Sequence, residues 1–265
     1  MPEKDLPTTL LDRIRAALPA RRAPLVVGLC GAQGSGKSTL VAALAARLGA
    51  EGIAAATLSL DDIYLTRAKR QDLARDVHPL LATRGVPGTH DVSLGFATLD
   101  ALARGEAVPL PRFDKGIDDR AALADWPLAP AATQVLLLEG WCLGARPQSV
   151  AALTEPVNML EAGEDPEGIW RTYANDALTG PYRALFGRID RLVLLAAPDW
   201  SVVAQWREQQ ESELRAVSLG AMTPQQVQRF IQHYERLTRW ILAEMPARAD
   251  LVVRLDADRR PLDLR

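Results

Sequence analysis

The chain has little cysteine, no long apolar run and no block of basic residues. Its two cysteines, Cys30 and Cys142, are too few for a disulfide framework in 265 residues, and they indicate buried free thiols. No segment approaches the roughly 18 apolar residues of a membrane-spanning helix. The net charge is −2 without a long run of Lys and Arg, so neither a membrane nor a nucleic acid is an expected partner. We expect a soluble, cytoplasmic protein that acts on small molecules, and its oligomeric state stays open.

Lysine is also scarce, since only four of the 31 basic residues are lysine: Lys4, Lys37, Lys69 and Lys115. Against this bias toward arginine, each retained lysine raises a question about its role. The composition, with 48% hydrophobic and 24% charged residues, is that of a globular protein with a sizeable core. The length predicts a single domain over residues 1–265, built on about 200 to 250 residues with a few excursions.

The most informative feature present is a glycine-rich octapeptide. Residues 31–38 read Gly-Ala-Gln-Gly-Ser-Gly-Lys-Ser and follow an apolar run at 25–29. After a buried strand, such a loop lets backbone N–H groups curl around phosphates, and the following helix directs its positive end at the same anions. Lys37 would reach the β- and γ-phosphates of ATP, and Ser38 would ligate Mg2+. The residues expected to bind ATP here are Gly31, Ala32, Gln33, Gly34, Ser35, Gly36, Lys37, Ser38 and Thr39.

Short apolar runs alternate with helical patterns along the rest of the chain. Strands are predicted at 25–29, 54–60, 135–138, 192–195 and 251–253, and helices at 10–18, 94–103, 167–178, 200–217 and 224–245, the last capped by Thr223. This alternation predicts an α/β fold, a three-layer α/β/α sandwich of the P-loop NTPase type with a mostly parallel sheet. Residues 1–23 would carry a lead-in helix. Residues 65–91 and 110–132 lack periodicity and predict long functional loops in a substrate-binding excursion at 65–132.

Acidic side chains follow two of the predicted strands. Asp61 and Asp62 come after the second strand, and Glu139 follows the run at 135–138, so all three belong at the edge where open α/β sheets bind ligands. One aspartate would take a proton from an attacking hydroxyl or hold Mg2+ through water, with helix capping as the alternative. Glu139 stands where an acid meets Mg2+ or its water, or is an exposed strand-end acid. The predicted metal site is Ser38, Asp61 and Glu139.

A polar loop at residues 84–91 carries candidate groups for the second substrate. Arg84 could pair with an anionic substrate. Thr89, His90 and Asp91 could hydrogen-bond its hydroxyl groups. A lone histidine in a loop is as readily a solvated side chain, so both roles stay open for His90.

Further charged residues lie in the next loop and on a predicted helix. Lys115 and Arg120 are suited to clamping a carboxylate or a transferring phosphoryl group, and a solvated charge cluster is the alternative. Arg207, Glu211 and Arg215 share one face of the helix at 200–217. Arg207 could close over the nucleotide in a helical lid at 200–222, or the three residues could form a surface salt-bridge ladder.

Together these segments resemble the P-loop D-glycerate 3-kinases, in the larger group that contains uridine, pantothenate and phosphoribulose kinases. The matching segments are 31–38, 59–66, 84–91, 111–115 and 138–144, which occur in order across most of the chain. The resemblance implies that Asp61 is the base. Together with Asp61, the predicted catalytic set is Lys37, Lys115 and Glu139. The predicted substrate pocket is formed by Asp62, Tyr64, Arg84, Thr89, His90, Asp91, Lys115 and Arg120. Ile63 replaces the usual Phe of its segment, which bears on packing.

The sequence therefore predicts transfer of the γ-phosphoryl group of ATP, with Mg2+, to a hydroxyl of D-glycerate, giving 3-phosphoglycerate. A kinase for a nucleoside, pantothenate or a sugar phosphate is the alternative in the same class, although four Phe and four Tyr disfavour an aromatic platform for a base. A regulatory P-loop ATPase is the alternative from another class. No Asn-Lys-x-Asp motif is present in the sequence, which disfavours a GTPase.

Overall fold

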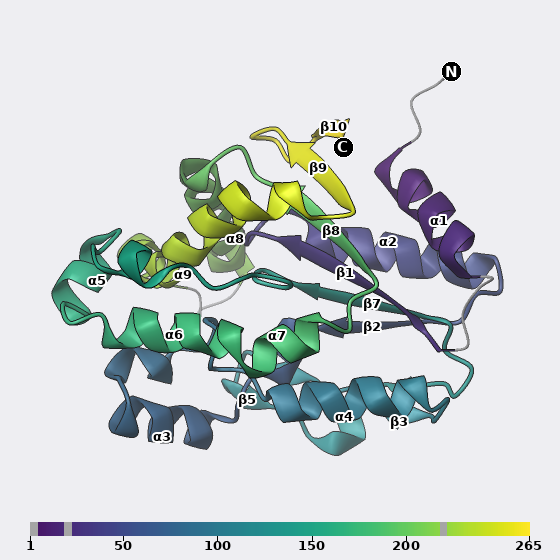
Figure 1. The fold of residues 1–265 in the computed structure, drawn as a ribbon, viewed down its shortest axis with the longest axis horizontal. Coiled ribbons are helices and arrows are strands. Elements are labelled where there is room, and N and C mark those ends of the chain that lie inside the picture. The colour runs from purple at the N-terminus through teal and green to yellow at the C-terminus, as the bar shows by residue number, and fades with distance from the viewer. Residues whose placement is uncertain (1–4, 19–22, 218–221) are drawn as a thin grey trace.

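In a computed structural model that describes residues 5–18, 23–217 and 222–265, the chain forms a six-stranded sheet with the order β10-β9-β8-β1-β7-β2 (Figure 1). Its strands are β1 (Leu25–Gly31), β2 (Ala55–Ser59), β7 (Val135–Gly140), β8 (Arg191–Ala196), β9 (Leu251–Leu255) and β10 (Pro261–Leu264). Neighbouring strands pair in parallel, except that β10 runs antiparallel to β9. The predicted α/β class and mostly parallel sheet are confirmed.

Helices cover both faces of the sheet. They are α1 (Leu6–Ala17), α2 (Lys37–Ala50), α3 (Arg67–Asp76), α4 (Val92–Ala103), α5 (Met159–Glu164), α6 (Ile169–Thr179), α7 (Pro181–Phe186), α8 (Trp200–Val217) and α9 (Pro224–Glu244). Successive residues of β7 point to opposite faces. Val135 and Leu137 pack in the core below α1 and α2, whereas Leu136 and Leu138 pack in the core below α4 and α7. A strand buried on both faces reads as a continuous apolar run, as the sequence predicts.

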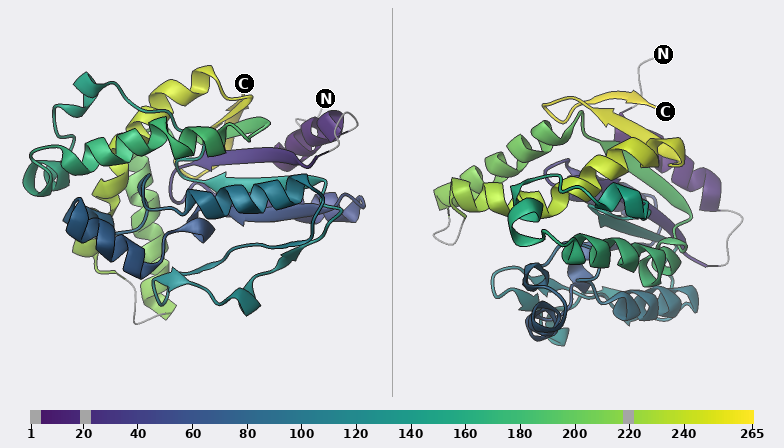
Figure 2. Two further views of the ribbon diagram at one scale, coloured as in Figure 1. Left: turned by 60° about the horizontal axis from the view of Figure 1, so that its bottom comes forward. Right: turned by 60° about the vertical axis from the view of Figure 1, so that its left-hand side comes forward.

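The excursion between β2 and β7 lies along one side of the molecule, at the bottom of Figure 1 and of the right view of Figure 2, and toward the viewer in the left view of Figure 2. The prediction of an irregular loop at 65–91 is wrong, because this segment contains the ten-residue helix α3. The Thr66 side chain caps the helix, and the one residue that α3 buries is Arg70. A helix without an apolar stripe leaves no periodicity to detect.

Residues 110–132 contain only short elements, as expected. The two-residue strand β4 (Phe113–Asp114) pairs with β5 (Asp119–Arg120), and β3 (Val108–Pro109) pairs with β6 (Leu128–Ala129). Because these strands are too short to hold the segment by backbone bonds alone, side chains must fix its course.

Other predictions hold with small shifts in boundaries. Helix α1 begins at Leu6, and Thr223 caps α9 in a capping box with Gln226. Cys30 and Cys142 are buried free thiols. Parts of the expected lead-in segment (1–4 and 19–22) and of the expected lid (218–221) lie outside the described residues.

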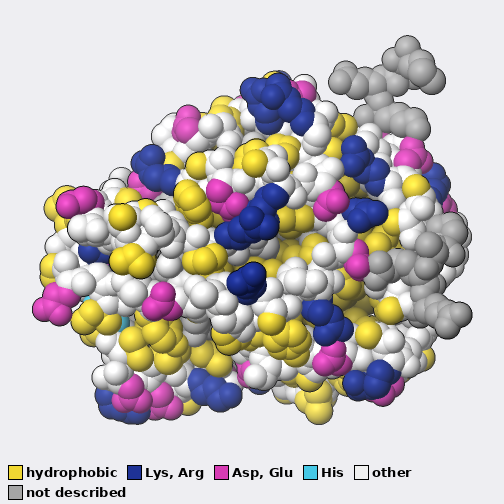
Figure 3. Space-filling model, viewed as in Figure 1, with side chains coloured by type: hydrophobic (Ala, Val, Ile, Leu, Met, Phe, Trp, Pro, Cys, Tyr) yellow, Lys and Arg dark blue, Asp and Glu magenta, His cyan; other side chains and the backbone are white. Residues whose placement is uncertain are grey.

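The surface of the protein carries charges of both signs, as is usual for a globular protein. The face drawn in Figure 3 mixes Lys and Arg with Asp and Glu among apolar side chains. Across the described ranges, no helix combines the length and the apolarity needed to cross a bilayer.

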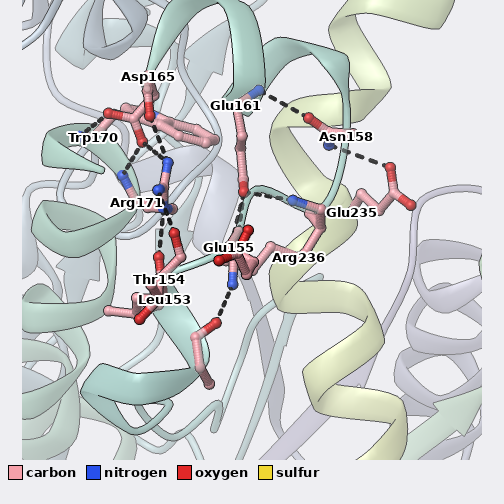
Figure 4. Close-up of polar contacts among 12 residues, drawn as sticks. Leu153, Thr154, Glu155, Asn158, Glu161, Asp165, Trp170, Arg171, Glu235 and Arg236 are labelled. Atoms are coloured by element: carbon pink, nitrogen blue, oxygen red, sulfur yellow. Dashed lines mark hydrogen bonds and ion pairs between the residues drawn. The ribbon is translucent and has the colours of Figure 1, made fainter. Parts of the chain in front are cut away.

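Two buried ion pairs join α5, α6 and α9 at one end of the molecule (Figure 4). Arg171 pairs with Asp165 at 3.1 Å, and Arg236 pairs with Glu161 at 2.6 Å. Because a buried charge without a partner is costly, each arginine is tied to its carboxylate. Val86 packs into the apolar cluster beside these helices, so this end of the molecule supports the loop at 84–91.

Candidate active site

The glycine-rich loop connects the end of β1 to the start of α2. Gly34 and Gly36 have φ values of +78° and +85°, which glycine adopts at little cost. The carbonyl oxygen of Ala32 accepts hydrogen bonds from the Ser35 N–H at 3.2 Å and from Lys37 Nζ at 3.1 Å. Gly36 caps α2 without a side chain, so the first N–H groups of the helix remain available to an anion.

A cavity of about 410 Å³ opens above this loop. Its walls come from the phosphate loop, the two acidic strand ends, the excursion, α8 and α9. The lining includes the predicted residues Gln33, Gly34, Gly36, Lys37, Ser38, Thr39, Asp61, Asp62, Tyr64, Arg84, Lys115, Glu139 and Arg207. The fold thus brings most of the predicted nucleotide, metal and catalytic residues to one cavity at the C-terminal edge of the sheet, the usual ligand position in such folds.

Asp61 lies in the 3-10 helix η2 (Leu60–Ile63), directly after β2. One carboxylate oxygen accepts a hydrogen bond from Lys115 Nζ at 2.7 Å, and the other accepts one from the Tyr64 hydroxyl at 2.9 Å. Burial opposes ionisation, but the charge and hydrogen bond of Lys115, together with Tyr64, lower the pKa of Asp61 below its usual value. Asp61 is therefore ionised at neutral pH and can accept a proton.

Asp62 has a structural role in the same turn. Its carboxylate accepts a hydrogen bond from the Ser59 N–H and pairs with Arg112 at 3.2 Å, so the capping alternative is observed for this residue. Burial, the largest influence, raises the pKa of Asp62 despite Arg112.

Glu139 faces the phosphate loop from the end of β7. The Ser38 hydroxyl donates a hydrogen bond to Glu139 Oε1 at 3.0 Å. Among the described residues, no three His, Cys, Asp or Glu side chains cluster so as to hold a metal by themselves. This arrangement fits Mg2+, which proteins usually hold with one or two carboxylates while nucleotide phosphates and waters supply the other ligands. Ser38 and Glu139 are joined by this hydrogen bond and Asp61 lines the same cavity, so the three predicted metal residues lie together.

Two cations face the cavity opposite the phosphate loop. Arg84 pairs with Asp118 and lies over the ring of Phe113, with 5.5 Å between Cζ and the ring centroid. Lys115 is 60% exposed and pairs with Asp61. Both cations are therefore available at the cavity surface, but each already has a carboxylate partner.

The remaining loop residues predicted to bind substrate lie behind the cavity wall. Thr89 is buried and bonds to the backbone of its own loop, and Asp91 caps α4 and pairs with Arg120 at 3.0 Å. His90 is buried with its ring 4.5 Å from that of Tyr64. Burial lowers the pKa of His90 to about 3, so it is neutral rather than a solvated loop histidine.

Aromatic residues that the sequence analysis did not assign also shape the site. Trp141 Nε1 donates a hydrogen bond to the Gly85 carbonyl at 2.9 Å, and the Tyr234 hydroxyl donates one to the Arg84 carbonyl at 3.2 Å. Both side chains line the cavity, as does Phe230. Trp141 lies in the segment 138–144, one of those that match the kinase family, so its part in the site could have been predicted from that match. The periodicity of α9 shows that Phe230 and Tyr234 share a face, but it does not show what that face contacts.

Arg207 of α8 lines the cavity and also pairs with Glu211 one turn along the helix. Its Cζ lies 5.5 Å from the ring centroid of Phe230. Of the expected ladder, the Arg207–Glu211 step forms, whereas Arg215 pairs with Glu208 instead. The role of Arg207 in a lid over the nucleotide stays a prediction.

The chain is similar to known kinases over most of its length. It is 36% identical over 222 residues to the uncharacterized kinase mug58 of Schizosaccharomyces pombe, covering 80% of this chain and 78% of that protein. It is 33% identical over 258 residues to the chloroplastic D-glycerate 3-kinase of Arabidopsis thaliana, covering 90% of this chain but 54% of that protein. The chain belongs to the D-glycerate 3-kinase family of P-loop kinases. No family model matches it.

The structure of this kinase agrees with that assignment. The D-glycerate 3-kinase from Cryptococcus neoformans has a similar structure, with a TM-score of 0.78, 29% sequence identity and coverage of 98% of this chain and 96% of that chain. The match therefore includes the excursion and α8 as well as the sheet. The resemblance predicted from the motifs is confirmed, and the protein is an ATP-dependent kinase of the P-loop class.

Proposed function

We propose that this kinase transfers the γ-phosphoryl group of ATP to a hydroxyl of D-glycerate and forms 3-phosphoglycerate. The observation that carries the proposal is the cavity in which ionised Asp61 and Lys115 face Lys37 and Ser38 of the phosphate loop. The similarity of the chain to D-glycerate 3-kinases from a plant and a fungus supports D-glycerate as the acceptor. A carboxylate substrate also suits a pocket with two cations, Arg84 and Lys115.

ATP would bind with its phosphates in the loop at 31–39, where backbone N–H groups, Lys37 and the start of α2 supply positive charge. Ser38, Asp61 and Glu139 would hold Mg2+ against these phosphates. The bound ion would neutralise negative charge on the β- and γ-phosphates. Arg207 would contact the nucleotide from α8.

Asp61 would orient the acceptor hydroxyl and take its proton. Tyr64 and Lys115 keep this carboxylate ionised before the substrates arrive. As the phosphoryl group leaves ATP, the positive charge of Lys115 would stabilise the negative charge that develops on that group. Catalysis then rests on positioning and charge compensation, which are the main requirements of phosphoryl transfer.

Arg84 would bind the acceptor carboxylate, with Asp62 and Tyr64 on the same wall of the pocket. We propose that Thr89, His90, Asp91 and Arg120 act on the acceptor by fixing the shape of that wall. The proposal also includes one kinase domain over residues 1–265, because the loop, the excursion and α8 line one cavity. It also includes the cytoplasmic location expected from the sequence.

The test is ADP release from Mg-ATP with D-glycerate, L-glycerate, uridine, pantothenate or ribulose 5-phosphate as the acceptor. Stimulation by D-glycerate alone, lost in Asp61→Asn, is the expected result. Stimulation by another compound instead would replace the acceptor and keep the kinase. Slow ADP release that no acceptor changes would contradict the proposal and favour a regulatory ATPase.

A further inference from the structure

The turn between β9 and β10 reaches the phosphate loop through one side chain, that of Arg259. The turn is closed by Asp256, whose Oδ1 accepts hydrogen bonds from the N–H groups of Asp258 and Arg260 at 2.9 and 2.8 Å. Arg259 has a φ of +66°, in the left-handed region that residues with a Cβ rarely adopt. A strained backbone that is held by a closed turn indicates that the direction of this side chain matters.

Arg259 connects three segments that are far apart in the sequence. Its Nε donates a hydrogen bond to the Gly34 carbonyl at 2.6 Å, and its Nη2 donates one to Gln209 Oε1 of α8 at 2.9 Å. Its Cζ lies 5.3 Å from the ring centroid of Trp206, also of α8. Trp206 is buried, and its Nε1 donates a hydrogen bond back to the Ala257 carbonyl of the turn at 2.7 Å. The guanidinium group is therefore fixed by two bonds and a stacked ring.

These contacts fix the peptide unit between Gly34 and Ser35. Arg259 holds the carbonyl oxygen of this unit, and the Ala32 carbonyl holds its N–H at 3.2 Å. A peptide plane that is held at both ends cannot rotate, although glycine itself would permit rotation. Trp206 also packs closely on Gly34, because a Cβ at Gly34 would lie 2.7 Å from the Cβ of Trp206. The next residues of the loop present their N–H groups to the phosphates only when this unit keeps its orientation.

We propose that Arg259 is a positioning residue for ATP, which sets nucleotide affinity by holding the phosphate loop and α8 in register. It is not among the residues that line the catalytic cavity, so it would act through Gly34 rather than by contact with the nucleotide. This inference rests on ATP binding by the phosphate loop and not on the identity of the acceptor.

The test compares Arg259→Gln with Arg260→Gln and Arg259→Lys. Arg260 is a matched control, because it is the adjacent arginine, is 77% exposed and pairs only distantly with Asp258, at 3.6 Å. The dissociation constant of Mg-ATP is measured by calorimetry without an acceptor. We expect Arg259→Gln to weaken ATP binding about tenfold to a hundredfold, the range for losing a hydrogen bond from a charged donor. Arg260→Gln should stay within about twofold of the unmodified protein, and Arg259→Lys, which keeps one charged donor, should fall between the two.

Steady-state kinetics separate positioning from general stability. The KM for ATP should rise in Arg259→Gln while the KM for the acceptor stays constant. A lower melting temperature with unchanged ATP affinity in the folded protein would overturn the proposal, as would equal losses for ATP and acceptor. If Arg259→Gln does not fold, Arg259→Lys decides, and unaltered ATP affinity in that variant overturns the proposal. Failure of D-glycerate to stimulate turnover would refute the proposed acceptor but leave the calorimetric result intact.

Discussion

The ion pair between Lys115 and Asp61 makes a prediction with two separable parts. Lys115→Met keeps an unbranched side chain of similar length and removes its charge. The lost contact is a 2.7 Å hydrogen bond between Lys115 Nζ and Asp61 Oδ2, with the two side chains 60% and 30% exposed. The variant should lose positive charge near the transferring phosphoryl group, and the ionisation of Asp61 should become less favourable.

The first part concerns the rate at saturating substrate and at the pH optimum. Removing one donor that stabilises developing charge costs about 10²- to 10³-fold in kcat. Because Lys115 is 60% exposed, water screens part of its charge, and we expect the lower end of this range, about 10²-fold.

The second part concerns the acidic limb of the pH profile. In the native protein, Lys115 helps to lower the pKa of Asp61 against burial, which opposes ionisation. Without Lys115, burial is opposed chiefly by Tyr64, so the pKa of Asp61 rises. A base must be ionised to act, and the acidic limb of kcat therefore moves to higher pH in the variant.

The assay is kcat for the best acceptor from about pH 3, below the usual pKa of an aspartate, to about pH 9, with Lys69→Met as the control. Lys69 is also 60% exposed, but its nearest carboxylate, Asp91, is 3.8 Å away. A loss of rate with an unmoved acidic limb would show that Lys115 serves the phosphoryl group alone. Native activity with a native profile would refute the reasoning on both counts.

Three further changes test the walls of the site. Tyr182→Phe removes the hydroxyl that accepts the N–H groups of Gly88 and His90, and should lower the free energy of unfolding in urea by about 2 kcal/mol or more; a loss below about 0.5 kcal/mol would contradict this role. Glu139→Gln should raise the Mg2+ concentration that gives half-maximal activity, and an unaltered Mg2+ titration would exclude Glu139 from the metal site. Gly85→Ala should lower the melting temperature, because Gly85 has a φ of +141° and a Cβ there would overlap the Tyr234 hydroxyl; a native melting temperature would refute that account.

The sheet could be predicted from the sequence because its central strands are buried on both faces. Val135 to Leu138 form an unbroken apolar run for this reason. The register that places Ser59 of β2 opposite Glu139 of β7 is known only from the structure. Helix α3 could not be predicted in the same way. Its one buried residue is Arg70, whose guanidinium bonds to the carbonyls of Leu65 and Ala82 rather than to apolar partners.

The site was predictable where it depends on the ends of strands and not where it depends on distant contacts. Asp61 and Glu139 reach the cavity because parallel strands end at one edge of the sheet. The orientation of the loop at 84–91 depends instead on Trp141, Tyr182 and Tyr234, which are 56, 92 and 150 residues from their partners in the loop. Nothing local to the loop indicates that Arg84 faces the cavity while His90 lies behind it.

The ion pairs of Arg84 and Lys115 also bear on how substrates would bind in the cavity. Lys115 is paired with Asp61 and Arg84 with Asp118 before any ligand arrives. An anionic acceptor that binds Arg84 would exchange with Asp118 there, and a phosphate that binds Lys115 would exchange with Asp61. The second exchange would remove Lys115, the strongest of the groups that lower the pKa of Asp61, and would leave the hydrogen bond from Tyr64 in place. Under the proposed mechanism, the ion pair with Lys115 would therefore keep Asp61 ionised until the phosphoryl donor binds.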